Sequence, residues 1–539
     1  MGVGEHMTID WKNWDDQTVS EVHGDIFLHR DLYEGNHAEL FPRAKDLIDN
    51  GEITDRYYNG PVKAKNVQTP YIIANLCKLI AEVPAMLVAR SIGKITSSIP
   101  SDKEDSEAAN EETDEFIDGP TSGDSSEIDD LQNEVLEQIE TNSKLQLEHW
   151  SNIVQHQVDG GLVGVPWNDE NGIRIEFKSR DVYFPHEDGL GVDLAYKRTV
   201  NETDYIHVYR ERQNKGNLEV EDMLFLLEGT RMTRLDDATA KEILKKDQLK
   251  NTFPGRSQMF ISYWPNNKTF MNPLGVSDLR NLFGKQEEIN WRLTNTGIVY
   301  ERNSKPRIAI SQAVFDDLMT KSEERYGVGN GHIDHRDLEI TTFDDQGRAM
   351  EVIQVDVKNI GGLEWAKDLM KTMLMETRTS EKALDFYADS SSNGAVSGVA
   401  KFYDLFVSIV KAEQIQQEYI YFLKQLIRSC LWLLNQDDKA VQIEEPDIAL
   451  NSMVPVTRTD LITENLPAFE GGGMSLETFV RKTNPTASEE WIQEEIERIE
   501  MERETVDSVT IQNGGQDGDN LDDNRDINGD PIEVEDDEE

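Results

Sequence analysis

Residues 272–310 read NPLGVSDLRNLFGKQEEINWRLTNTGIVYERNSKPRIAI, and within this stretch the pattern of the chain changes. From Pro273 to Arg302 apolar residues recur at helical spacing, and five of them fall near one face: Leu279, Leu282, Phe283, Ile289 and Leu293. The run IAI that follows is short and apolar, which predicts a strand. The stretch therefore predicts an amphipathic helix that leads into a separate small region.

The residues before this helix predict two kinds of structure. Residues 25–96 have a largely helical pattern, and helix is expected again from about Ile128 to Gln157. Residues 172–264 consist of short β-rich runs, such as IRIEFKSRDVYF and YIHVYRERQ, separated by Gly, Asn and Asp turns. This alternation predicts a largely antiparallel β region.

The residues after the helix predict a small insertion between two helices. Residues 303–359 combine the strand-like runs IAI, LEITTF and MEVIQVDV with a helical piece and the loop YGVGNG. A second helix is expected over Leu363–Phe386 and a long one from about Val399 to Asn435, joined by the small polar loop ADSSSNGAVSG. The expected fold class is therefore α+β.

The chain of 539 residues is strongly acidic, with a formal net charge of −50. Residues 101–130 hold thirteen Asp and Glu against one Lys, and residues 502–539 hold fifteen against two Arg. Dense like charge with few apolar residues predicts disorder in both segments. This balance excludes a basic protein that coats DNA, because phosphate neutralisation needs exposed Lys and Arg.

The cysteines and the hydropathy of the chain argue against a disulfide-rich, a secreted or a membrane-spanning protein. Cys77 and Cys430 both lie in helical apolar patterns, so neither a disulfide scaffold nor a CxxC metal site is predicted, and a reducing cytosol fits. No secretory signal is expected at the N-terminus. The most apolar stretch, Tyr71–Ile95, is interrupted by four charged residues and Pro84, so no membrane span is predicted.

Three segments, in this order, resemble the portal proteins of tailed bacteriophages: residues 272–310, residues 376–405 (ETRTSEKALDFYADSSSNGAVSGVAKFYDL) and residues 471–504 (GGGMSLETFVRKTNPTASEEWIQEEIERIEMERE). The resemblance covers roughly residues 25–500 and rests on this combination, not on a catalytic signature. It implies a portal-like α+β fold with a mostly helical wing and stem, an antiparallel β region in the wing, a small α/β clip and a short C-terminal helical crown.

The resemblance also implies a division of the chain. The expected regions are an N-terminal segment 1–24, a wing 25–271 with a disordered acidic insertion 97–130, a first stem helix 272–302, a clip 303–359, a second stem helix 360–387, a tunnel loop 388–398, a long wing helix and return strand 399–470, crown-like helices 471–501 and an acidic disordered tail 502–539. The short C-terminal helix leaves little room for a large crown.

A portal-like role implies a ring of about twelve copies at one capsid vertex, through which double-stranded DNA is packaged and ejected. The implied partners are further copies of the chain, DNA, the terminase large subunit, head–tail connector or adaptor proteins, and the major capsid and scaffolding proteins. The location would be the virion, and the host cytoplasm during assembly. No cofactor, metal or catalytic residue is predicted.

Three sets of residues are candidates for contact with DNA or partners. The tunnel-loop set is Asp389, Ser390, Ser391, Ser392, Asn393 and Gly394, whose small side chains permit close approach to a DNA cylinder. The stem set is Lys367, Lys371, Arg378 and Lys382, which fall within roughly 60° on a helix of about 100° per residue. The clip set is Lys305, Arg307, Arg325 and Arg336.

Each set has a plainer alternative. The stem cations can form a solvated face or pair with Asp and Glu of an adjacent subunit, and Glu364 and Asp385 dilute the stripe. The loop can be an ordinary flexible connection, and the clip cations ordinary surface charges. His332 and His335 lack the further ligands that a metal site needs.

Two other classes of protein compete with the portal reading. A packaging ATPase needs a GxxxxGK[ST] loop, and the sequence has none; GxSxG, HExxH and paired CxxC motifs are also missing. A minor head protein or another virion structural protein remains, but nothing in that class requires two helices around a small α/β insertion. The sequence therefore favours a structural role and predicts no enzymatic activity.

Overall fold

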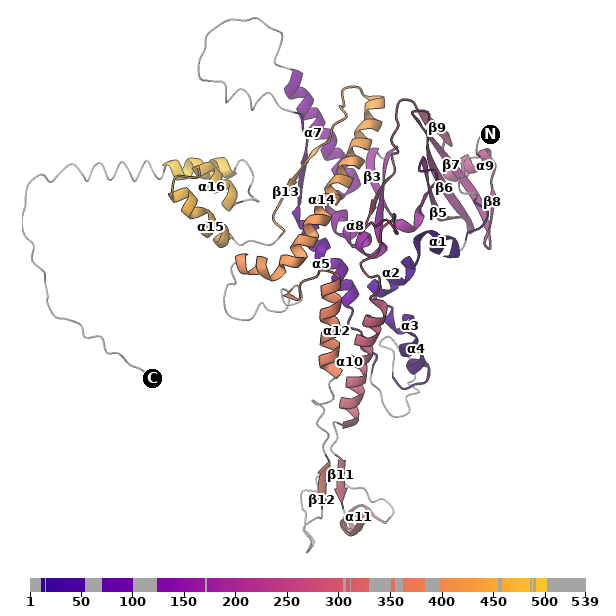
Figure 1. Cartoon of the computed structure of the whole chain (residues 1–539), viewed down its shortest axis with the longest axis vertical. Helices are drawn as coiled ribbons and strands as arrows, with labels where there is room; N and C mark the ends of the chain where they lie inside the picture. Colours follow the sequence, from indigo (N-terminus) through magenta and orange to yellow (C-terminus); the bar gives the residue numbers. More distant parts are fainter. Residues whose placement is uncertain are drawn as a thin grey trace, which may run out of the picture. The chain divides into compact units, whose positions relative to one another are not determined.

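The computed structural model describes residues 11–14, 16–53, 70–99, 124–169, 172–303, 307–310, 312–328, 350–353, 362–382, 398–453, 458–484, 487 and 491–501. Apart from Gly398, the described residues up to Met453 form one compact unit, and those from Arg458 onward form another together with Gly398. Figure 1 labels the helices and strands. Together they make an α+β fold with antiparallel sheets, as predicted.

The main hydrophobic core of the first unit lies among helices. Its helical elements before residue 160 are α1 (Asp16–His23), α2 (Ile26–Glu34), α3 (His37–Leu40), α4 (Pro42–Asp49), α5 (Leu76–Ser91), α7 (Asp124–Ser143) and α8 (Leu145–Asp159). The forty-residue helix α14 (Gly398–Asp437) supplies Tyr419 and Leu423 to the same core, where they meet Ile80 of α5 and Ile153 of α8. This core explains why so long a helix is stable, because one face is buried along much of its length.

Two expectations for the helical part need correction. The predicted helix over Ile128–Gln157 is broken at Lys144, whose φ is 51°, so α7 and α8 are separate helices. The helical pattern of residues 25–96 ends in strand β1 (Ile92–Thr96), which pairs antiparallel with β13 (Asp447–Leu450). Residues 124–130 of the predicted disordered insertion belong to α7, and residues 100–123 lie outside the described part of the chain.

The predicted antiparallel β region is confirmed, and it forms two sheets. The smaller sheet has the order β10-β2-β3, with β10 (Ser262–Pro265), β2 (Gly161–Asp169) and β3 (Gly172–Ser179). The larger sheet has the order β4-β5-β6-β7-β8, with β9 also on β7; its strands are β4 (Tyr183–Pro185), β5 (Gly191–Val200), β6 (Thr203–Asn214), β7 (Asn217–Glu228), β8 (Arg231–Arg234) and β9 (Lys250–Phe253). The 3₁₀ turn η1 (Arg180–Val182) and helix α9 (Asp237–Leu244) complete this region.

Helices α10 (Phe283–Asn303) and α12 (Gly362–Glu376) lie side by side (Figure 1). Lys285 near the start of α10 binds Glu376 at the end of α12, so the two helices are antiparallel. Helix α10 begins ten residues later than Pro273, where the pattern predicted it. Gly275 has a φ of 83° and packs on the backbone of Gly160 and Asn266, a conformation that excludes a helix there.

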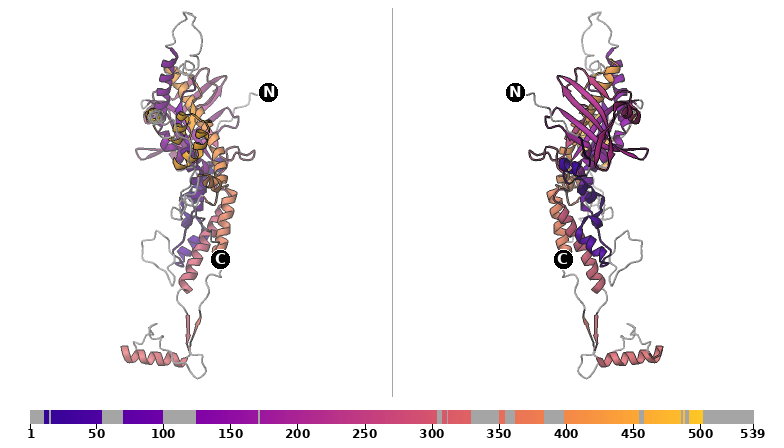
Figure 2. Two further views of the ribbon diagram at one scale, coloured as in Figure 1. Left: turned by 90° about the vertical axis from the view of Figure 1, so that its left-hand side faces the viewer. Right: turned by 90° about the vertical axis from the view of Figure 1, so that its right-hand side faces the viewer.

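The chain between α10 and α12 contains a small antiparallel pair. Strand β11 (Arg307–Ile310) pairs with β12 (Met350–Ile353), and α11 (Gln312–Tyr326) follows β11. The strand predicted from IAI and the helical piece after it are therefore confirmed. Figure 2 shows α10 and α12 from two further sides.

The second unit is helical. It contains α15 (Arg458–Glu470), α16 (Leu476–Thr483) and a helical stretch over 491–501. Ser475 caps α16 by accepting a hydrogen bond from the Thr478 amide, and Phe469 stacks on Phe479 with 4.6 Å between ring centroids. The strand expected over 440–462 is limited to β13, because α15 has already begun at Arg458. The predicted acidic tail lies outside the described residues.

Candidate functional site

The paired helices α10 and α12 are held together by an apolar seam and one ion pair. Met373 and Leu374 of α12 are buried in the same core as Ile289 of α10. At the end of this seam the Lys285 ammonium lies 2.6 Å from the Glu376 carboxylate. Of these residues the helical spacing in the sequence predicted Ile289 on an apolar face, and this residue is fully buried.

The predicted stripe of four cations does not form one helical face. Lys367 and Lys371 are exposed on α12, but α12 ends at Glu376, so Arg378 and Lys382 lie beyond it. Arg378 has a φ of 54° and donates to the Gln414 amide oxygen at 3.3 Å. A residue in the left-handed region cannot continue a helix. The spacing of 100° per residue, which predicted all four cations on one face, therefore does not apply beyond Glu376.

The charge of the exposed α12 face is also mixed. Glu364 and Asp368 are exposed on α12 together with Lys367 and Lys371, so they balance its two lysines. Lys371 lies 3.8 Å from Glu381, a weak pairing between two exposed side chains. The outward face of α12 is therefore close to neutral, and the alternative of a solvated, ion-paired face fits it better than a basic stripe.

Most of the other predicted contact residues lie outside the described part of the chain. These are all six tunnel-loop candidates from Asp389 to Gly394, together with Lys305 and Arg336 of the clip; His332 and His335 lie there too. Arg307 is on β11, and Arg325 is exposed near the end of α11. Of the four clip candidates, the described residues therefore place only Arg307 and Arg325, on β11 and on α11.

A buried lysine that the sequence analysis missed joins four segments. The Lys411 ammonium of α14 pairs with the Asp278 carboxylate and donates to the Thr377 carbonyl at 3.0 Å. Asp278 also accepts from the side-chain amides of Asn266 and Asn267, at 3.1 and 2.6 Å. Lys411 of α14 therefore connects three further segments: the residues just before α10, the turn after α12 and the loop after β10.

The turn after α12 has a second attachment to α14. The Ser380 amide donates to the Ser408 hydroxyl at 2.8 Å, and the Ser380 hydroxyl donates to the Asp404 carbonyl. This turn directly precedes the segment in which the tunnel-loop candidates lie. The turn after α12 is therefore attached to α14 at Asp404 and Ser408 as well as at Lys411.

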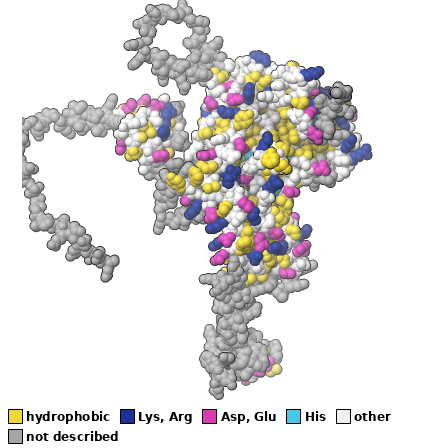
Figure 3. Space-filling model, in the orientation of Figure 1, with side chains coloured by type: hydrophobic (Ala, Val, Ile, Leu, Met, Phe, Trp, Pro, Cys, Tyr) yellow, Lys and Arg dark blue, Asp and Glu magenta, His cyan; other side chains and the backbone are white. Residues whose placement is uncertain are grey.

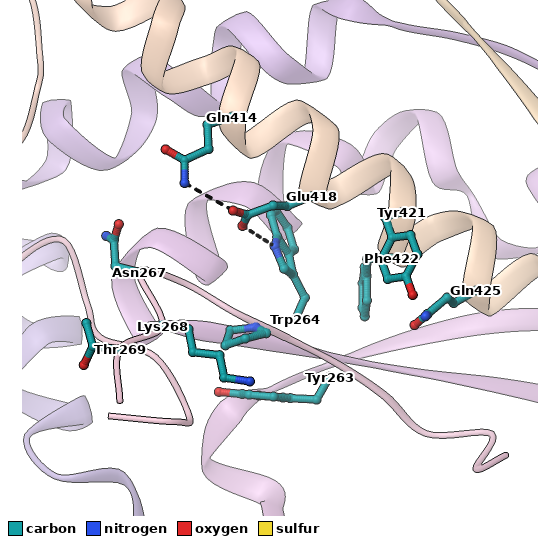
Figure 4. Close-up of a pocket in the computed structure, with 11 residues that line it drawn as sticks. Tyr263, Trp264, Asn267, Lys268, Thr269, Gln414, Glu418, Tyr421, Phe422 and Gln425 are labelled. Atoms are coloured by element: carbon teal, nitrogen blue, oxygen red, sulfur yellow. Dashed lines mark hydrogen bonds between the residues drawn. The ribbon is translucent and has the colours of Figure 1, made fainter. Parts of the chain in front are cut away.

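A trough of about 520 Å³ lies between α14, β10 and the loop after β10 (Figure 4). The Glu418 carboxylate accepts from the Trp264 indole at 3.2 Å and from the Gln414 amide, also at 3.2 Å. Tyr421, which is 65% exposed, and Lys268 also line it. An open trough of aromatic and amide groups suits contact with protein better than capture of a small molecule.

The same face of α14 continues as an apolar line toward the start of the helix. Tyr403, Phe406, Val407 and Val410 are 72%, 49%, 50% and 47% exposed. In Figure 3 hydrophobic side chains reach the surface near the beginning of α14. These four residues have the spacing i, i+3, i+4, i+7, which can be seen in the sequence. The sequence does not show that they are exposed, because a buried helix face has the same spacing.

The β region holds a bonded chain of titratable side chains that resembles catalytic geometry. The Tyr196 hydroxyl lies 2.6 Å from His207 Nδ1, and His207 Nε2 lies 2.7 Å from the Asp222 carboxylate. Burial, with the Asp222 charge, raises the pKa of Tyr196 to about 12. These bonds tie β5, β6 and β7 together through their side chains.

Among the described residues no three His, Cys, Asp or Glu side chains are grouped so that they could hold a metal ion. Within the same part of the chain no helix has the length and apolar character needed to cross a bilayer.

Comparison with known proteins assigns no family. No protein-family model matches the chain, and no curated protein matches it. Among solved structures the chain is similar to one described as "Neck of native GTA particle computed with C12 symmetry", at 10% identity and a TM-score of 0.34, over 75% of this chain and 87% of that one.

Proposed function

We propose that this chain is the subunit of a portal-type ring, a channel for double-stranded DNA at a capsid vertex. The observation that carries the proposal is the antiparallel pair α10 and α12, whose connecting segment contains β11, α11 and β12. A helix pair that leaves a packed wing and returns to it after a small insertion suits the wall of a channel. The order of segments that resembles portal proteins adds support.

A closed ring also needs a surface through which each copy contacts the next. Such an interface is heterologous: one surface of a subunit meets a different surface of its neighbour. The exposed apolar positions on α12, Trp365 and Met375, and those along α14 provide surface that an isolated subunit would leave in water. Within the proposal, docked terminase or connector proteins would use the far end of the stem, and the chain itself would hydrolyse nothing.

The proposal is tested by negative-stain electron microscopy of the purified full-length protein. Class averages down the symmetry axis should show rings whose central hole admits a DNA duplex, and ATPase assays of the same rings should give no turnover. A population that stays monomeric at high protein concentration, or an intrinsic ATPase activity, would contradict the proposal.

A further inference from the structure

Helix α8 exposes two large apolar side chains near its start. Leu147 is 77% exposed and Trp150 is 40% exposed, and residues three apart lie next to each other on a helix surface. The helix begins after the break at Lys144, whose φ is 51°; beyond this break Leu145 is fully buried, whereas Leu147 stays in water. An exposed Trp beside an exposed aliphatic residue is typical of a protein contact surface.

A groove of about 570 Å³ adjoins this apolar pair, between the second half of α7, strand β1 and the start of α8. Leu147 forms part of its lining. The charged residues that line it are Lys94, Glu134, Glu137, Glu140 and Lys144. Among the described residues, Glu140 accepts a hydrogen bond from the Gln146 amide at 2.7 Å, whereas Glu134 and Glu137 have no ion-pair partner. The groove therefore holds charges that this part of the chain leaves unpaired.

The charges of the groove favour a basic occupant. Its lining has three carboxylates, all on α7, against two lysines, and Glu134 and Glu137 are both exposed. The net charge of −50 also attracts a cationic partner and repels an acidic one. A second copy of this chain carries the same excess of carboxylates, so a basic partner gains more from these contacts.

We propose that Leu147, Trp150 and the adjoining groove form the docking site for a basic amphipathic helix of a different protein. The apolar residues of that helix, spaced i, i+3 and i+4, pack on Leu147 and Trp150, and its Lys or Arg side chains pair with Glu134 and Glu137. Such a helix presents both kinds of side chain on adjacent faces, as the site requires. The assignment goes beyond the proposed ring and does not depend on it, because one subunit carries the whole site.

The first test uses a fluorescein-labelled helical peptide built of leucine and lysine only, whose binding to the full-length protein is measured by fluorescence anisotropy. E134K/E137K and L147S change the site, and E242K/D247K is the matched control, because Glu242 and Asp247 are exposed carboxylates on α9 and after it. Circular dichroism checks folding. We expect E134K/E137K to weaken binding at least about tenfold and L147S about fivefold, and the control about twofold or less. Equal losses in the site and control variants, or no binding to the wild type, would overturn the proposal.

The second test locates the bound peptide. The native Cys77 and Cys430 are fully buried, so maleimide reaches a cysteine introduced at position 147, or at the exposed Leu190 as a control. At a peptide concentration about tenfold above its Kd, labelling of L147C should slow about tenfold, whereas labelling of L190C should not change. Unprotected L147C would place the peptide elsewhere and overturn the proposal. Slower labelling of L147C at higher protein concentration, without peptide, would make a second copy the occupant and overturn it too.

Discussion

Lys411 of α14 and Asp278 before α10 form an ion pair in which both side chains are at least 95% buried. The lysine also donates to the Thr377 carbonyl, so its ammonium joins the segment before α10 and the turn after α12 to α14. Two charges taken out of water are stabilising only when each satisfies the other, so the pair defines one arrangement of these segments.

Removing one member of this pair should be far more costly than removing a surface ion pair. We expect Lys411→Ala or Asp278→Ala to lower the free energy of unfolding by about 3–5 kcal/mol, since each leaves a buried charge unpaired. The matched control is Lys197→Ala, whose partner Asp204 lies 2.7 Å away in an exposed pair and should cost about 0–1 kcal/mol. Urea unfolding measures both. Equal losses in the two pairs would show that the buried pair has no special role.

Stability should fall as the pH drops below 6.5, because burial keeps several histidines neutral. The pKa of His149 is lowered to about 4 by burial beneath Tyr419. The unfolded chain then binds a proton that the folded chain does not, so stability is present above pH 6.5 and is lost between 6.5 and 4. We expect about 2 kcal/mol of loss from this group between pH 7 and pH 5.

His149→Gln should remove that share of the pH dependence. The measurement is the free energy of unfolding at pH 7 and pH 5 for the wild type and the variant. Other buried histidines behave alike, since burial also lowers the pKa of His23 and His156 to about 3. The variant should therefore show a smaller slope, not a flat one. An unchanged slope would contradict the assignment of His149 as a neutral buried group.

Glu211 should act in the opposite direction at higher pH. Burial raises the pKa of its carboxyl to about 7, although the amides of Phe260 and Ile261 donate to it at 2.8 and 3.1 Å. The folded chain binds this proton more tightly than the unfolded chain, so stability declines as the pH rises from about 4.5 to 7. Between pH 6 and pH 8 the loss should be about 1 kcal/mol.

Glu211→Gln keeps an acceptor for the two amides and cannot ionise. Its unfolding free energy should therefore vary less between pH 6 and pH 8 than that of the wild type, in chemical denaturation at both values. If the variant and the wild type change in parallel, Glu211 is ionised in the folded protein throughout this range.

Two glycines should respond in opposite ways to the same substitution. A Cβ at Gly164 of β2 would overlap the Leu426 side chain of α14, so Gly164→Ala should cost about 1–3 kcal/mol. Gly284 in the first turn of α10 has no atom within 4 Å of such a Cβ, so Gly284→Ala should stabilise by up to about 1 kcal/mol. Thermal unfolding of both variants checks the pair, and a stabilised Gly164→Ala would show that α14 does not pack closely on β2.

Local pattern alone predicted a substantial part of the fold. The antiparallel β region, the strand at IAI and the long helix after Val399 follow from the period of apolar residues and the placement of turn residues, which depend on nearby sequence. The helical pattern misplaced ends: α10 begins after Gly275, and α12 stops before Arg378. Near each end a residue in the left-handed region, Gly275 or Arg378, packs against a distant segment of the chain. The spacing of apolar residues along the sequence contains no information about such contacts.

The sequence by itself determined the α+β class, the order of the elements and the acidity that separates this chain from proteins that coat DNA. Only the tertiary structure decided which apolar faces are buried and which are exposed. The face of Leu405 and Ile409 and the face of Val407 and Val410 have the same helical spacing, yet α5 covers the first and leaves the second in water. Likewise, Lys411 is buried and paired because the fold brings Asp278 and Thr377, which are distant in the sequence, into contact with it.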